Sequence, residues 1–108
     1  MSGMTPELYR ENMIELMVLQ ALLGVLSSKV KALTLEFEGE DVIAYFLFRE
    51  ESPEDREEIE EDFPSEVEAF TGGVPGLEGV LARPVIQLVQ DYPPGYVPPG
   101  RRVFRFRD

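Results

Sequence analysis

The side chains of this sequence that could bind a ligand or catalyse a reaction are its carboxylates, because they are numerous and closely spaced. Eleven acidic residues and one base, Arg56, lie between Glu50 and Glu68. Three kinds of chemistry use such a cluster: attraction of a basic protein, coordination of a hard cation, and acid–base catalysis by a carboxylate pair. The alternative to all three is a solvated helix face whose acids provide solubility alone.

The spacing of these acids favours a protein partner over a metal or an active site. Calcium loops interleave acids with glycine and end in a bidentate glutamate, and no D-x-[DN]-x-[DN]-G pattern occurs here. No glycine-rich phosphate loop or nucleophile elbow accompanies the acids, and the chain has neither histidine nor cysteine. We therefore predict that the protein is not an enzyme and uses no cofactor or metal. A carboxylate-bound cation stays open as the weaker alternative.

Two groups of residues are predicted to contact a partner. Like charges three or four residues apart oppose a helix by about 0.2–0.5 kcal/mol per pair, a cost that a basic partner would offset. A second contact is predicted in a Pro-rich loop, because tyrosine is enriched at interface hot spots. The alternative for the loop is a stiff connection between strands. The predicted partner-binding residues are Glu54, Glu57, Glu58, Glu61, Glu68, Tyr92 and Tyr96.

The overall charge points to the same kind of partner. The 108 residues carry 21 acids and 10 bases, for a net charge of −11. Such a chain repels nucleic acid and attracts a cationic protein. Residues 83–108 differ, because they hold five arginines against two aspartates. These arginines either form a basic edge that binds nucleic acid or an acidic partner or, as we favour, pair with acids on neighbouring strands or blunt a sheet edge.

The first predicted helix runs from Pro6 to about Leu26, with Thr5 as its cap. It is apolar on nearly all sides, which is typical of a buried helix or of one that packs on two surfaces. We therefore consider two alternatives: a deeply buried central helix, or a helix whose second face lies in a homodimer or partner interface. Its apolar run of 14 residues from Met13 is too short to span a membrane.

The remaining elements alternate between strands and one helix. Leu33–Phe37 and Val42–Phe48 are predicted as a hairpin, because apolar residues and β-formers recur there around Gly39. A second helix begins at Ser52-Pro53, and Pro64 should kink or divide it. Further strands are predicted at 80–90, with Pro84 at an edge or bulge, and at 102–107.

These elements predict one α+β domain over residues 1–108. The expected fold is a two-layer α/β sandwich with the order α-β-β-α-β-β. An antiparallel four-stranded sheet would have both helices on its apolar face. The amino terminus lacks the basic region of an export signal, so we expect a cytoplasmic protein.

Three stretches of the chain resemble a known group of proteins. They are the run Leu22–Ser27, the hairpin Ala32–Phe48 and the run from Ser52-Pro53-Glu54-Asp55 to Phe70. Over about residues 10–70 they resemble small acidic immunity proteins of bacterial polymorphic toxin systems, including contact-dependent growth inhibition.

The resemblance implies a cytoplasmic inhibitor that binds a cognate toxin domain and blocks its active site. Toxins that cut nucleic acid have basic clefts, which an acidic face would fill. The Pro-rich loop and Pro64 depart from the family pattern and leave the binding surface open. The alternative function is a homodimeric structural or adaptor protein with no toxin partner.

Overall fold

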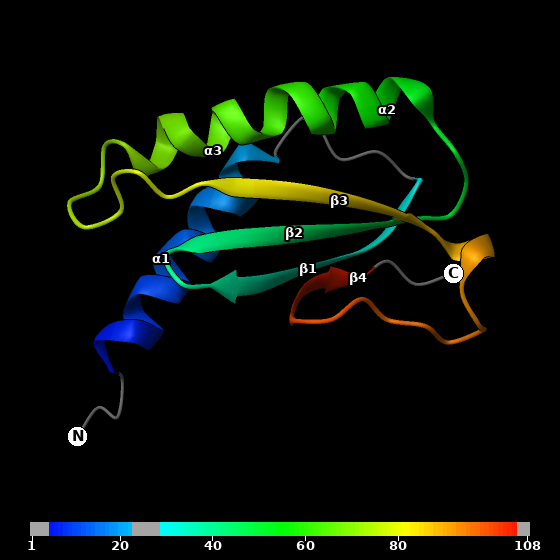
Figure 1. The fold of residues 1–108 in the computed structure, drawn as a ribbon, viewed down its shortest axis with the longest axis horizontal. Helices are drawn as coiled ribbons and strands as arrows, with labels where there is room; N and C mark the ends of the chain where they lie inside the picture. Colours follow the sequence, from blue (N-terminus) through cyan, green and yellow to red (C-terminus); the bar gives the residue numbers. More distant parts are fainter. Residues whose placement is uncertain (1–4, 23–28, 106–108) are drawn as a thin grey trace.

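The computed structural model shows a mixed α+β architecture and describes residues 5–22 and 29–105 (Figure 1). The helical elements are α1 (Pro6–Ala21), α2 (Pro53–Glu57), the π-helical segment η1 (Glu58–Asp62), α3 (Phe63–Thr71) and the short 3-10 helix η2 (Val89–Asp91). The strands are β1 (Val30–Glu38), β2 (Asp41–Phe48), β3 (Ala82–Leu88) and β4 (Arg101–Arg105). Because α2, η1 and α3 follow one another without a break, we call residues 53–71 together the acidic helix.

The sheet has the strand order β3-β2-β1-β4. β1 is antiparallel to β2 and β4, but β2 and β3 are parallel, so the predicted antiparallel sheet is wrong at this pair. The acidic helix is the reason. It is roughly 28 Å long and carries the chain back along the roughly 26 Å of β2. Ala82 of β3 therefore lies beside Val42 at the start of β2.

Two further differences from the predicted order α-β-β-α-β-β concern the helices. The second helix consists of three segments, and η2 follows β3 directly. The predicted edge position of Pro84 is confirmed, because β3 is an outer strand. In the observed register Pro84 directs its missing N–H outward, where no strand needs it.

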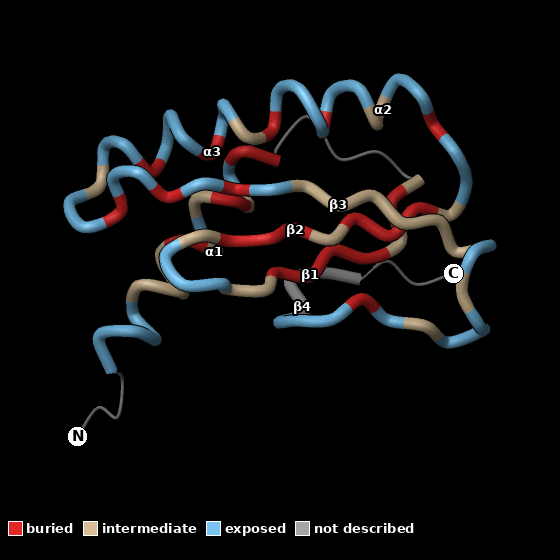
Figure 2. Tube along the Cα trace, in the orientation of Figure 1, coloured by how far each residue is buried: buried red, intermediate tan, exposed pale blue. Residues whose placement is uncertain are grey.

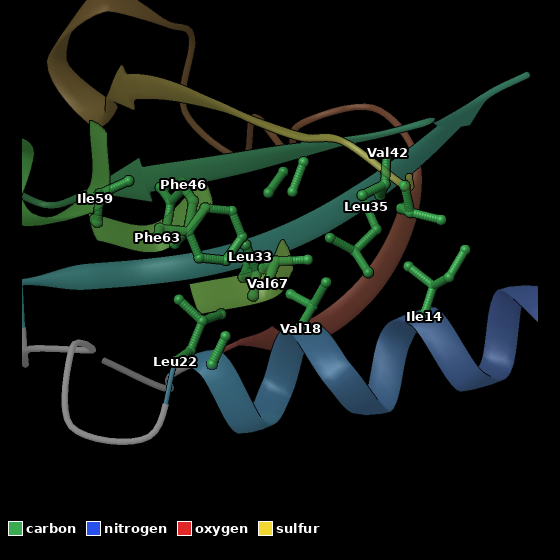
Figure 3. Packing of buried hydrophobic residues seen from close by; sticks show 14 of the residues in the cluster. Ile14, Val18, Leu22, Leu33, Leu35, Val42, Phe46, Ile59, Phe63 and Val67 are labelled. Carbon is green, nitrogen blue, oxygen red and sulfur yellow. The ribbon is translucent and has the colours of Figure 1, made fainter. Parts of the chain in front are cut away.

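One hydrophobic core lies between the helices and one face of the sheet (Figure 3). Side chains alternate along β2, and along β1 beyond the register shift between Val30 and Ala32, so every second residue of these stretches faces the core. Phe46 and Phe63 meet there edge to face, with ring centroids 5.3 Å apart. The core side chains labelled in the figure are Ile14, Val18, Leu22, Leu33, Leu35, Val42, Phe46, Ile59, Phe63 and Val67.

The opposite face of the sheet is covered by the Pro-rich loop, residues 92–100. The Thr34 hydroxyl donates to the Pro99 carbonyl at 2.7 Å, and the Tyr96 hydroxyl donates to Gln87 Oε1 at 3.0 Å. Ile43 and Leu47 of this face are 8% and 2% exposed. The loop therefore adds a partial third layer to the expected two-layer sandwich.

The first helix is buried along one side only. The predicted cap is confirmed, since the Leu8 N–H donates to Thr5 Oγ1 at 3.1 Å. α1 ends at Ala21, and residues 23–26 of the predicted helix lie outside the described residues. Ile14 and Val18 are fully buried, whereas Tyr9 and Leu16 are 59% and 52% exposed.

The exposure of this side excludes one of the two interpretations of α1. A deeply buried central helix is excluded for residues 6–21, because one side is open to solvent (Figure 2). Among the described residues, no helix combines the length and apolar character needed to cross a membrane.

Candidate functional site

The start of the acidic helix is set by Ser52 and Pro53, as predicted. Ser52 is 6% exposed, and its hydroxyl oxygen accepts the Asp55 N–H at 3.3 Å. Pro53 occupies the first helical turn, where its missing N–H has no intrahelical partner to lose. The acids that follow are therefore presented on a helix with a fixed beginning.

Replacing Ser52 by alanine is expected to lower the free energy of unfolding by about 1 kcal/mol, because it removes this cap. Chemical denaturation followed by circular dichroism measures the change. Ser52→Thr keeps the hydroxyl and should lower the free energy of unfolding much less. Equal losses for the two variants would mean that the hydroxyl oxygen does not stabilise the helix.

Pro64 is accommodated by a π-helical turn. η1 occupies the five residues before α3, and the Phe63 N–H donates to the Glu58 carbonyl five residues earlier. The wider turn precedes the proline, which has no N–H of its own. The helix therefore continues to Thr71 instead of dividing, and Ile59, Phe63 and Val67 all reach the core.

An open acidic groove of about 310 Å³ lies on the solvent side of α2 and η1. Every residue that lines it is an acid: Glu54, Asp55, Glu57, Glu58, Glu61 and Asp62. Four of the predicted contact residues thus come together. Glu68 does not line the groove and lies exposed on α3. The prediction omitted Asp55 and Asp62, although their separation of seven residues, two helical turns, places them on one side of a helix.

The one base within this stretch is held by an acid outside the groove. Arg56 donates from Nε and from its terminal nitrogen to the two carboxylate oxygens of Glu51, at 3.1 and 3.3 Å. This hydrogen bonding raises the pKa of Arg56. The pair is exposed and adds little stability. Its consequence is that the Arg56 charge is already engaged by Glu51.

Tyr92 and Tyr96 lie apart from the acidic groove. Their rings stack with centroids 4.0 Å apart and planes 11° from parallel. The loop that carries them covers the sheet face opposite the helices, where Tyr96 bonds Gln87. Both rings are half-buried. The seven predicted contact residues therefore occupy three separate places, and a partner contact at the tyrosines stays a prediction.

Two arginines of the basic carboxyl-terminal segment pair with acids, but neither acid lies on a neighbouring strand, because Glu38 belongs to β1, two strands from β3, and Glu15 belongs to α1. Arg83 lies 3.6 Å from Glu38, and Arg101 lies 3.2 Å from Glu15. Arg101 also donates to Asn12 Oδ1 at 2.7 Å, which joins β4 to α1. The side chains of Arg102, Arg105 and Arg107 lie outside the described part of the chain.

The acids do not converge as ligands would. Within residues 5–22 and 29–105, no group of three or more acidic side chains is arranged to hold a metal ion. The carboxylates of the groove instead lie in a row along one side of a helix. Such a row suits several separate cationic side chains better than one ion.

The fold and its charge define a small mixed α+β protein with one strongly acidic helix. The model of the MafI2 immunity protein family matches residues 11–73, more than half of the chain. The chain belongs to this family, and the resemblance to toxin immunity proteins is thereby confirmed. Membership indicates an immunity role against a toxin. No curated protein matches the chain.

Proposed function

We propose that the protein neutralises its cognate toxin by placing the acidic groove over a basic active-site cleft. The observation that carries the proposal is the groove itself, whose six lining residues are all acids. A nuclease cleft binds phosphates with lysine and arginine, and carboxylates on a helix can occupy the same positions. The protein then acts by occlusion and catalyses no reaction.

The core beneath the groove supports this proposal. Ile59 is fully buried between neighbours that line the groove, and Phe63 and Val67 continue the same buried side. The helix that carries the carboxylates is therefore held in place before the toxin binds, which lowers the entropic cost of association. The net charge of −11 would also speed the encounter with a basic domain.

The extent of the family match also supports the acidic groove as the toxin contact. It spans β1, β2 and the whole acidic helix, and it ends before β3. The groove thus lies inside the matched segment, whereas Tyr92 and Tyr96 lie beyond it. In our proposal the groove makes the principal contact, and Glu68 and the two tyrosines make secondary contacts.

Charge reversal of Glu57, Glu58 and Glu61 to lysine is expected to lower the rate of toxin association roughly 10–100-fold, because it removes electrostatic steering. The toxin domain would first be captured from a lysate of the host at near-physiological salt and identified by mass spectrometry. Surface plasmon resonance at two salt concentrations then measures association and dissociation separately.

A matched control reverses three exposed acids that do not line the groove: Glu40, Glu60 and Glu66. Both triple variants have the same net charge. If the groove is the contact, the control loses only the long-range part of the attraction. Equal losses for the two variants would instead assign binding to overall charge and contradict a contact at the groove.

A further inference from the structure

The outward side of α1 is largely apolar, and α1 itself places no charged side chain on it. At 100° per residue, its members fall within an arc of about 140° opposite Ile14 and Val18. They are Leu8, Tyr9, Asn12, Met13, Leu16, Leu19 and Gln20. Charged residues make up 29% of the whole chain, whereas none of these seven is charged. We call these residues the α1 outer face. Arg101 of β4 reaches one edge of the face, where it pairs with Asn12 and Glu15.

An apolar groove of about 410 Å³ adjoins this face. The Arg10 side chain in its wall turns to the Glu40 carbonyl, to which it donates at 3.0 Å. The groove is lined by Tyr9, Arg10, Met13, Val74, Pro75, Gly76 and Leu77. An exposed apolar side chain, Leu16, thus lies along the same helix as a groove of the size that would receive it.

We propose that the α1 outer face is the interface of a symmetric homodimer. In a two-fold dimer the same patch meets itself, so a projecting side chain and its receiving groove must lie on one surface. An antiparallel crossing of two α1 helices near Met13 satisfies this condition. It places Leu16 of each copy against Tyr9 and the groove of the other.

The distribution of charge favours a second copy as the occupant. Two chains of net charge −11 repel each other, and a face whose own residues are uncharged, with a paired Arg101 and Glu15 at its edge, lets them meet with little repulsion. Figure 1 shows α2 toward the opposite end of the molecule from the first turns of α1, and the acidic groove is lined by residues of α2 and η1. A dimer through α1 therefore keeps the two acidic grooves apart and open. A basic partner would gain little from Glu15, the carboxylate at the edge of this face, because Glu15 is already paired with Arg101.

The expected dimer is weak and strengthens with salt. α1 is roughly 24 Å long, and one face of such a helix buries less than the roughly 800 Å² per partner of a standard interface. Raising salt from 0.1 to 1 M shortens the Debye length from about 10 to about 3 Å and screens the repulsion. Toxin binding at the acidic groove should respond to salt in the opposite direction.

Sedimentation equilibrium of the full chain, over a concentration series at both salts, tests the proposal. Leu16→Glu should raise the dimer dissociation constant roughly tenfold or more, because it places a charge in an apolar contact. Leu81→Glu is the matched control, since Leu81 is 58% exposed outside α1 and the substitution adds the same charge. Circular dichroism checks that both variants keep the native fold.

Three results would overturn the dimer: monomer alone at the highest concentration in 1 M salt, dissociation that increases with salt, or equal effects of Leu16→Glu and Leu81→Glu. None of them bears on the acidic groove. Conversely, groove variants that still bind toxin normally would contradict the proposed function and leave the dimer untouched. The two proposals therefore fail separately.

Discussion

Replacing Phe63 by alanine is expected to lower the free energy of unfolding by about 3–5 kcal/mol. Phe63 is fully buried where the π-helical segment passes into α3, and its ring meets Phe46 of β2 edge to face. The substitution removes both the burial and the aromatic pair, and it leaves a cavity between the acidic helix and the sheet. A domain of this size is typically stable by only about 5–15 kcal/mol, so a large part of its stability would be lost.

Phe70→Ala is the control for this prediction. Phe70 lies on the same helix but is 37% exposed, so its loss should cost less than about 1 kcal/mol. Urea unfolding followed by circular dichroism compares the two variants with the parent chain. Similar losses for both would mean that Phe63 does not anchor the acidic helix. Because Phe63 adjoins η1, its loss should also weaken toxin binding without any change in charge.

Replacing Gly100 by alanine is expected to lower the free energy of unfolding by roughly 2–4 kcal/mol. Gly100 has a φ of +99°, a backbone angle that residues other than glycine rarely adopt. A methyl group there would also overlap the Leu35 carbonyl oxygen and lie 2.8 Å from the carbonyl carbon. The obstacle is backbone of a central strand, so neither side can yield without breaking the β1–β4 pairing.

Gly95→Ala separates these two effects. Gly95 also has a positive φ, +83°, but nothing lies within 4 Å of the added carbon. Gly95→Ala should therefore lower the free energy of unfolding only by the cost of placing alanine at a positive φ, roughly 1–2 kcal/mol. Denaturant titration of the two variants measures the difference. If Gly100→Ala were no worse than Gly95→Ala, the close approach of residue 100 to β1 would be contradicted.

Local features of the fold were predictable from the sequence, because each depends on residues close together in the chain. Thr5 and Ser52 both cap helices, and a proline follows each of them. The hairpin of β1 and β2 follows from period-two alternation and the turn at Gly39. Four of the groove residues were predicted for the same reason, since helical spacing alone places them on one side.

Other features depend on contacts between segments that are far apart in the sequence. The parallel pairing of β2 and β3 follows from the length of the helix between them, which the residues of the strands themselves do not encode. Pro64 signalled an irregular helix, but the choice of a π turn over a break depends on the burial of Phe63 and Val67. The loop with Tyr92 and Tyr96 is long because β3 and β4 lie at opposite edges of the sheet and run in the same direction.

By itself, the sequence determined the charge of the protein, the positions of its helix starts and its hairpin. It also determined the clustering of acids on one helix, and its pattern gave the resemblance to immunity proteins. Only the tertiary structure decided which acids line one groove, that the tyrosine loop covers the other sheet face, and that one side of α1 stays exposed. Helix and strand periods fix which residues share a face, but packing alone decides what lies against that face.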